Sequence, residues 1–213
     1  RRPPSGMDHA MSSRWNDTDA PRGAEYDARF AVLAAAGEDV HGEATFVAGF
    51  QPRSVLDAGC GTGRVAIELR RRGVEKGQSI ETVGVDADSG MLTAALEGDP
   101  HGEWHLGDVS TMSFDDGFGA LRRFDVVVAA GNVMIFLAPG TEAATVANLA
   151  AHLTPGGALI CGFQLKPDRY SLNRFEADCE AAGLEPVERW STWDRQSFDP
   201  GGDYVVAVHR QPR

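Results

Sequence analysis

The sequence predicts a three-layer, doubly wound α/β fold whose mostly parallel sheet ends in an antiparallel hairpin. Short apolar runs typical of strands alternate with helix-like segments from residue 24 to about residue 184, and the last two strand candidates follow each other without a helix. Parallel neighbours need a crossover of a dozen or more residues, usually helical. The last two strands are therefore expected to pair antiparallel, and the earlier strands to pair in parallel.

The strand candidates are short and apolar, as expected where helices cover both faces of a parallel sheet. They are Ser54–Ala58, Thr82–Asp86, Glu103–Gly107, Phe124–Ala130, Ala158–Phe163, Val187–Thr192 and Tyr204–His209. The helix candidates end at or close to a glycine or a proline, the usual stop signals. They are Ala24–Ala36, His41–Phe50, Gly63–Arg72, Thr141–Leu153 and Ser171–Ala182.

Length indicates one domain, because 213 residues suffice for one large core but not for two full-sized domains. Residues 1–23 are polar and are predicted to form a flexible segment, with Met7 and Met11 as candidate natural starts. Residues 24–213 are predicted to form the domain. No apolar run approaches the roughly 18 residues that span a bilayer, and the N-terminus lacks the apolar core of a signal peptide. No membrane partner is expected.

The net charge is −11 at pH 7, which repels phosphate backbones at long range. A nucleic-acid partner is therefore not expected, and the oligomeric state is left open. The densest basic stretch, 70–72, is interpreted as a last helical turn whose charge opposes the negative end of the helix dipole before Gly73.

The cysteines are Cys60, Cys161 and Cys179, without the CxxC spacing of a zinc site. Neither a disulfide framework nor a metal is expected, and a reducing cytoplasm is the expected location. Cys60 is interpreted as a small apolar side chain rather than a nucleophile.

A glycine-rich turn carries the strongest functional signal. The strand that ends at Asp57 is followed by Gly59, Gly61 and Gly63 and then by a helix. Glycines there permit positive φ and let a ligand lie against the backbone. Asp86 and Asp108 follow the next two strands, so three strand ends present groups suited to one adenosine-bearing ligand at the carboxyl edge of the sheet.

The glycine spacing argues against a nicotinamide dinucleotide. The dinucleotide pattern needs a glycine or alanine where this chain has Arg64. Asp57 within the turn would repel a pyrophosphate, whereas it would attract the sulfonium and the amino group of S-adenosylmethionine.

The motifs together resemble class I S-adenosylmethionine-dependent methyltransferases over about residues 24–209, in particular small-molecule enzymes with an N-terminal helical lid. The matching motifs are Val55–Gly63, Val83–Asp86, Gly107–Val109, Phe124–Asn132 and Leu153–Gly157. The resemblance implies a seven-stranded sheet whose last strand is inserted antiparallel, in agreement with the predicted hairpin. It also implies S-adenosylmethionine as the cofactor.

The resemblance further implies roles for individual residues. Asp57 and the backbone of Gly59, Gly61 and Gly63 would hold the amino-acid part of the cofactor. The other implied contacts are Asp86 for the ribose with Ala87 next to it, Met91 on the adenine, Asp108 and Val109 at the polar edge of the adenine, and Ala130 and Asn132 near the methionine end and the acceptor.

Some side chains have two interpretations. Tyr26 either covers the sulfonium through a cation–π contact or packs with Phe30 as an i, i+4 pair. Trp15 either closes a lid or anchors the N-terminal segment. His41 and His105 are weak candidates for a general base, which a hydroxyl acceptor would require.

The predicted function is methyl transfer from S-adenosylmethionine to a small molecule by in-line displacement. This chemistry mainly requires positioning and exclusion of water, so no catalytic triad is expected. The alternatives are a non-catalytic protein that binds S-adenosylmethionine or S-adenosylhomocysteine and, less favoured, an NAD(P)-dependent oxidoreductase. The sequence does not name the acceptor.

Overall fold

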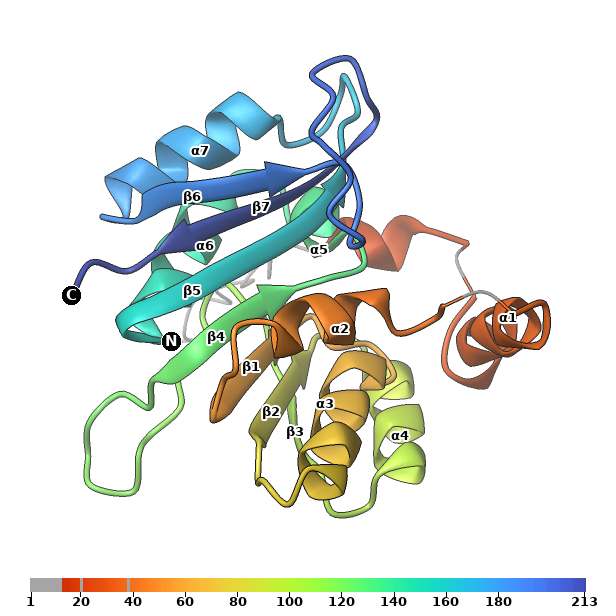
Figure 1. Ribbon diagram of the computed structural model, residues 1–213. Coiled ribbons are helices and arrows are strands. Elements are labelled where there is room, and N and C mark those ends of the chain that lie inside the picture. Colours follow the sequence, from red (N-terminus) through yellow and green to blue (C-terminus); the bar gives the residue numbers. More distant parts are fainter. Residues whose placement is uncertain (1–12, 20, 38) are drawn as a thin grey trace, which may run out of the picture.

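The computed structural model describes residues 13–19, 21–37 and 39–213. Figure 1 shows a twisted sheet with helices on both faces. The helices are the 3-10 helix η1 (Arg14–Asp17), α1 (Ala24–Ala35), α2 (Gly42–Ala48), α3 (Arg64–Glu75), α4 (Ser89–Gly98), α5 (Val133–Phe136), α6 (Glu142–Ala151) and α7 (Leu172–Ala181). The strands are β1 (Ser54–Ala58), β2 (Glu81–Asp86), β3 (Glu103–Leu106), β4 (Phe124–Ala129), β5 (Leu153–Gln164), β6 (Glu185–Trp190) and β7 (Tyr204–Arg210).

The seven strands form one sheet in the order β3-β2-β1-β4-β5-β7-β6. The first five strands pair in parallel. β7 lies between β5 and β6 and is antiparallel to both. The predicted fold class is therefore confirmed, including the antiparallel hairpin and the inserted last strand.

The sheet has a hydrophobic core on each face, because successive side chains of a strand point to opposite faces. Leu56 and its equivalents pack with the side chains of α5, α6 and α7. Val55 and its equivalents pack with α2 and α3 through residues such as Phe46 and Leu69. This burial on both faces explains why the strands read as continuous apolar runs.

The start of β5 differs from the prediction, which placed residue 153 in a helix and began the strand at Ala158. The helix ends at Ala151, and β5 begins at Leu153, which pairs with Phe124. Gly156 adopts φ +80° and donates its N–H to the carbonyl of Gln211. A positive φ at glycine lets the strand continue through the Pro-Gly-Gly segment, which local stop signals cannot reveal.

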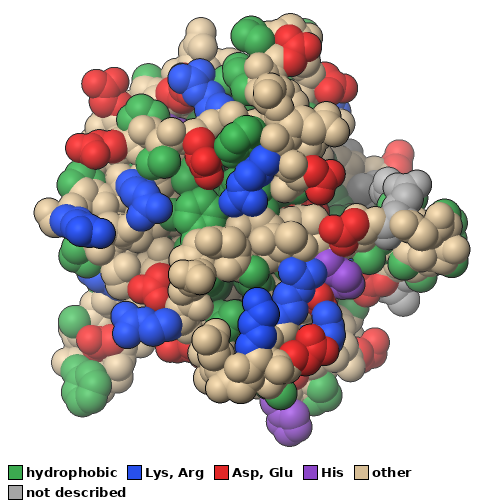
Figure 2. Space-filling model, viewed as in Figure 1, with side chains coloured by type: hydrophobic (Ala, Val, Ile, Leu, Met, Phe, Trp, Pro, Cys, Tyr) green, Lys and Arg blue, Asp and Glu red, His purple; other side chains and the backbone are tan. Residues whose placement is uncertain are grey.

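The basic stretch 70–72 does not form the last turn of its helix, because α3 continues through Gly73 to Glu75. Arg71 and Arg72 instead share the buried carboxylate of Glu68 at 2.7 and 2.6 Å, and Arg70 lies 3.2 Å from Asp99. Figure 2 shows basic side chains over α3 with acidic ones beside them. The helix-dipole interpretation is therefore wrong for most of this stretch.

The predicted flexible segment falls largely outside the described residues, since residues 1–12 are not among them. Residues 13–19 and 21–23 precede α1, which begins at the predicted domain boundary, Ala24. No helix among the described residues is long and apolar enough to cross a membrane.

Candidate functional site

A cavity of about 410 Å³ opens where the loops after β1, β2, β3 and β4 meet the N-terminal segment. Its position at the carboxyl edge of a parallel sheet is the usual ligand site of such folds. All the predicted binding residues except Gly63 line this cavity. They are Tyr26, Asp57, Gly59, Gly61, Asp86, Ala87, Met91, Asp108, Val109, Ala130 and Asn132.

The glycine turn is shaped by its own backbone and by the β4 exit. Gly59 and Gly61 have φ of +72° and +56°. A Cβ at Gly59 would lie 2.5 Å from Cγ2 of Val133, which no side chain tolerates without a shift. The amides of Gly59 and Cys60 both donate to the carbonyl of Val85, at 2.8 and 3.0 Å. The turn is thus fixed in a form that only glycine allows.

Gly63 lies outside the cavity and has a packing role. It precedes α3 with φ +76°, and a Cβ there would lie 2.5 Å from the ring of Trp104. Cβ atoms at Gly84 and Gly102 would each come within 2.4 Å of the same indole. Trp104 therefore occupies a groove between three glycines, and a contact of Gly63 with the cofactor stays a prediction.

Asp57 is the buried charge of the cavity, with 1% of its surface exposed. Burial raises its pKa from 3.8 to about 7, while a backbone hydrogen bond from Ala66 and the charge of Arg64 act in the opposite direction. Its Oδ2 atom has no hydrogen-bond partner among the described residues. Since a buried carboxylate oxygen needs a partner, the cavity fits a ligand with a cationic or N–H donor group here.

The carboxylate of Asp86 faces the same cavity and is fixed by backbone amides. Its Oδ2 accepts from the N–H of Gly61 at 2.8 Å, and its Oδ1 accepts from the N–H of Asp88 at 2.9 Å. Burial raises its pKa. Each oxygen keeps a further lone pair, so the oriented carboxylate fits a hydroxyl-bearing group such as a ribose.

Two residues after β3 complete this end of the cavity. Asp108 Oδ1 accepts from the amide and the hydroxyl of Ser110, at 2.8 and 2.7 Å. The Val109 carbonyl accepts from Asn148 at 3.0 Å. With Met91, these groups give an apolar slot with a polar rim, which fits an adenine.

The exit of β4 is a left-handed turn. Gly131 and Asn132 have φ of +66° and +70°. The Oδ1 atom of Asn132 accepts from the N–H of Gln164 at 2.7 Å, and its own N–H donates to the carbonyl of Gly162 at 3.2 Å. Asn tolerates this conformation better than most residues. Asn132 therefore ties the cavity wall to β5 through its side-chain oxygen and its backbone N–H.

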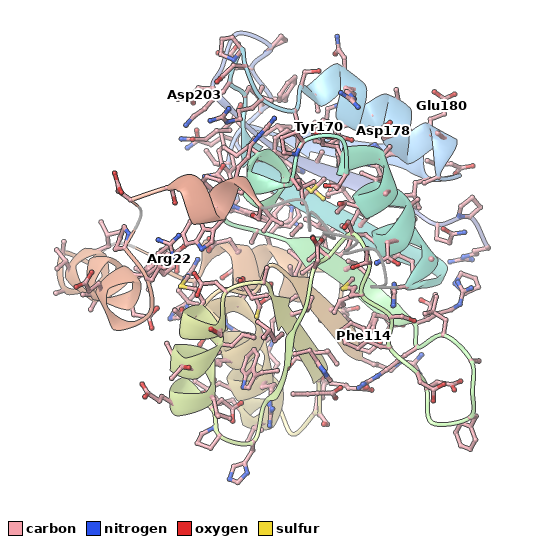
Figure 3. All side chains as sticks on the ribbon, turned by 180° about the vertical axis from the view of Figure 1, so that it is seen from behind. Arg22, Phe114, Tyr170, Asp178, Glu180 and Asp203 are labelled. Carbon is pink, nitrogen blue, oxygen red and sulfur yellow. The ribbon has the colours of Figure 1, made fainter. Side chains whose placement is uncertain are left out.

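The N-terminal segment covers the cavity with Ser13, Trp15, Tyr26 and Phe30. Asp88, which caps α4, is one attachment point. Its Oδ2 accepts from Nε1 of Trp15 at 3.0 Å and from Nε of Arg22 at 2.8 Å. Figure 3 shows Arg22 between α1 and the body of the domain. Trp15 thus anchors the N-terminal segment to Asp88, as in the second of its two interpretations.

Further contacts hold α1 and the segment before η1. The Thr62 hydroxyl donates to Asp27 at 2.6 Å, directly above the glycine turn. The Ser13 hydroxyl donates to the Phe136 carbonyl at 2.8 Å, and the rings of Trp15 and Phe136 meet edge to face at 5.3 Å. Both polar contacts join residues far apart in the sequence, so no local pattern predicts them.

Phe30, Arg64 and Thr62 are among the cavity residues that the sequence did not identify. Phe30 was considered only as a packing partner of Tyr26, whose ring lies 5.2 Å from it. Arg64 was read only as a break in the dinucleotide pattern, and Thr62 as part of the turn. The available signal was the position of Thr62 and Arg64 inside and directly after the glycine motif.

Neither histidine candidate lines the cavity. His105 lies on β3, with its Nε2 atom 2.9 Å from Glu103. His41 precedes α2, and its Nδ1 atom is buried without a partner among the described residues. A general-base role for His41 or His105 therefore stays a prediction that their positions do not support. Across the described ranges, no group of three His, Cys, Asp or Glu side chains is placed to hold a metal ion.

Known proteins resemble this chain in fold and in sequence. A family model described as "Methyltransferase domain" matches residues 55–157. A TehB-like SAM-dependent methyltransferase from Corynebacterium glutamicum is 32% identical, with a TM-score of 0.74, covering 88% of this chain and 96% of that one. The amino pentose methyltransferase CalS10 from Micromonospora echinaspora is 20% identical with a TM-score of 0.65, covering 91% of this chain and 99% of that one. At this identity, the likeness to CalS10 shows the fold alone.

A curated relative, the ribosomal protein L11 methyltransferase of Herpetosiphon aurantiacus, is 28% identical over 181 residues. The match covers 76% of this chain and spans half the length of that relative. The glycine turn, the two strand-end aspartates and the unpartnered Asp57 oxygen fit S-adenosylmethionine as the cofactor. With the match to the Corynebacterium protein, they show that the chain belongs to the class I S-adenosylmethionine-dependent methyltransferases.

Proposed function

We propose that this chain transfers the methyl group of S-adenosylmethionine to a small-molecule acceptor by in-line displacement. The observation that carries the proposal is the size and position of the cavity. Strand ends and the N-terminal segment line a volume of about 410 Å³, within the range of small-ligand pockets. A cavity of this size, set between two walls of the domain, favours a small-molecule acceptor.

The cofactor supplies an already activated methyl group, so the protein mainly positions the two reactants. Reacting atoms held about 3–3.5 Å apart in a water-excluded site can gain a large part of the rate enhancement. In this proposal Tyr26 faces the acceptor side. A Cβ at Gly131 would lie 3.9 Å from the Tyr26 hydroxyl, so this side chain lies next to the β4 exit.

The N-terminal segment acts as a lid in this proposal. Its aromatic side chains reach the cavity, and polar contacts to Asp88 and Thr62 are part of its attachment to the domain. Such an attachment can open without disturbing either core. The three cysteines are free thiols, which supports the cytoplasmic location expected from the sequence.

The test is transfer of a labelled methyl group from S-adenosylmethionine into a cell extract separated into small-molecule and macromolecular fractions. Label in the small-molecule fraction that Asp57→Ala abolishes supports the proposal. Label in protein alone would overturn it in favour of a protein acceptor, as the name of the ribosomal protein L11 methyltransferase suggests for that relative. Cofactor binding without label in any fraction would favour the non-catalytic alternative.

A further inference from the structure

The loop between β3 and β4 carries a projecting arm, residues 115–121, with a large apolar side chain at its tip. Phe118 is 95% exposed, more than any other large apolar side chain among the described residues. Figure 1 shows this loop standing away from the sheet below the start of β4, and Figure 2 shows an apolar side chain at its end. A Cβ at Gly117 or Gly119 would meet no atom within 4 Å, so the tip of the arm lies in solvent.

The arm is ordered although its tip touches nothing. Its two sides are joined by an antiparallel bridge, and the N–H of Asp116 donates to the Ala120 carbonyl at 2.9 Å. The Asp116 side chain accepts from the N–H of Phe118 at 2.8 Å. At the root of the arm, Phe114 is buried with its ring 4.9 Å from that of His105. The arm thus holds an aromatic ring in water, and aromatic side chains are enriched at protein interfaces.

The arm is acidic as well as aromatic. Asp115 and Asp116 are exposed and form no ion pair within the part of the chain that the structure describes. The neighbouring Arg122 bonds to Glu81 and Glu103 instead. A surface that receives the arm must therefore hold an aromatic ring and supply positive charge for two carboxylates.

A second cavity, of about 220 Å³, lies at the end of the strands opposite the cofactor cavity. This edge pocket lies between the turn before β1, the start of β4 and the start of β5. Phe50, Pro52, Pro155, Arg53 and Arg210 are among the residues that line it. A cavity of about 150 Å³ already holds a benzene molecule, so the edge pocket has room for a phenyl ring.

The edge pocket is basic, in a chain with a net charge of −11. Arg210 bonds to the Gly156 carbonyl at 3.1 Å, and the Arg53 side chain is 91% exposed with its Nε atom 3.7 Å from Asp125. Arg213 lies beside the pocket, since a Cβ at Gly156 would be 3.7 Å from its Nε atom. Figure 2 shows basic side chains on the flank that also carries the arm. Three arginines with one aspartate leave positive charge that the acids of the arm match.

The root of the arm and the edge pocket lie close together on this edge of the sheet. Asp125, which lines the pocket, follows Leu121 by four residues, a separation of at most about 14 Å. The arm does not enter the pocket of its own copy, because Phe118 is exposed. When complementary features share one surface, two copies related by a two-fold axis form the same contact twice and close the pair.

We propose that this edge is the interface of a dimer in which the arm of each copy enters the edge pocket of the other. Phe118 is the anchor, and its ring stacks on a guanidinium or on the apolar wall of the pocket. Asp115 and Asp116 face Arg53 and Arg210. The cofactor cavity lies at the opposite edge of the sheet and stays open in the dimer.

Sedimentation equilibrium tests this dimer directly. Because a small interface is weak, the wild-type dimer should have a dissociation constant on the order of 10–100 µM. Phe118→Ser should raise this constant by at least about tenfold, since buried aromatic anchors dominate such contacts. The fold should be unaffected, because this side chain is exposed. Wild-type protein that stays monomeric well above this range would overturn the proposal.

Val74→Ser is the matched control, because Val74 is a 76% exposed apolar side chain on α3, outside the arm and the edge pocket. It should leave the dissociation constant unchanged. Arg53→Glu/Arg210→Glu should abolish the dimer, since the pocket would then repel the arm. A dimer that Phe118→Ser weakens no more than Val74→Ser, or that survives reversal of the pocket charge, would overturn the proposal.

Cysteine trapping identifies the surfaces that meet. The three natural cysteines are buried, so cysteines introduced at exposed positions react selectively. Mixed under mild oxidation, Ala120→Cys and Pro155→Cys copies should form a disulfide between an arm and a pocket. Val74→Cys copies should not trap Ala120→Cys copies. Absence of the mixed disulfide, or an equal yield with Val74→Cys, would overturn the proposal and assign any self-association to another surface.

Discussion

The cavity has a floor formed by the loops after β1 to β4 and a roof formed by the N-terminal segment, of which Ser13, Trp15, Tyr26 and Phe30 line the cavity. Different interactions hold the floor and the roof. The floor consists of backbone turns with buried residues such as Asp57 and Ala130, 1% and 7% exposed. The roof is half-exposed and is attached through hydrogen bonds to Asp88, Thr62 and the Phe136 carbonyl. Floor geometry therefore depends on the sheet, whereas roof geometry depends in part on side-chain hydrogen bonds, each worth about 1 kcal/mol.

Because of this difference, we expect substitutions in the floor to reduce cofactor affinity strongly and substitutions in the roof to change it less. The sharpest way to test the comparison is to alter one residue at a time on each side. A roof variant that cost more affinity than any floor variant would contradict it. Four experiments follow in order of decreasing expected effect.

The largest effect is expected for Gly59→Ala. The new Cβ would lie 2.5 Å from Val133 Cγ2 at φ +72°, so the turn must shift. We expect S-adenosylmethionine binding to become undetectable by calorimetry and the free energy of unfolding to fall by about 2–4 kcal/mol. Gly140→Ala is the control, since its φ is +85° and no atom lies within 4 Å of its Cβ. Equal effects of both would mean that only backbone strain matters.

The next effect is expected for Asp57→Asn, which keeps the size of the side chain but removes its charge. Loss of a charged hydrogen bond in a buried site costs about 1.5–3 kcal/mol, so cofactor affinity should fall by about 10- to 100-fold. The unfolding temperature should not fall, because the variant also relieves a buried charge. Unchanged affinity would exclude Asp57 as the ammonium partner.

A smaller effect is expected from pH. Because burial raises the pKa of Asp57 to about 7, the free protein carries a proton on this side chain at lower pH. An ammonium ligand binds the ionised form, so affinity should fall by up to about tenfold from pH 8 to pH 6 and level off above pH 8. Asp86, whose pKa burial also raises, can contribute to this slope. Asp57→Asn should remove the contribution of Asp57 to this pH dependence. If the pH dependence of cofactor affinity is unchanged in that variant, a group other than Asp57 titrates.

The smallest effect is expected for Asp88→Asn in the roof attachment. The amide oxygen can still cap α4, where Asp88 Oδ1 accepts from the N–H of Gly90 at 2.8 Å. The charge that holds Trp15 and Arg22 is lost, so cofactor dissociation should accelerate by about fivefold, with stability within about 0.5 kcal/mol. Stopped-flow release of S-adenosylhomocysteine measures this rate. No change would mean that the roof does not control exchange of the cofactor.

The part of the site that could be predicted from the sequence is the floor. Glycines at 59 and 61 and acids at the ends of β1 and β2 are local patterns, and parallel pairing brings strand ends to one edge whatever the details of packing. The groove that holds Trp104 and the early start of β5 were missed. They depend on Gly84 and on pairing with Gln211, which lie far along the chain.

The sequence by itself determined the α/β class, the antiparallel hairpin and the glycine turn with its aspartates, because hydrophobic periodicity and glycine conformation act over a few residues. Only the tertiary structure decided how the roof is attached, that Asn132 bonds to Gln164, and that Arg64 pairs with Glu43. These features are contacts between side chains and partners that are distant in sequence. Their geometry is set when the sheet and its helices pack, so no local pattern contains it.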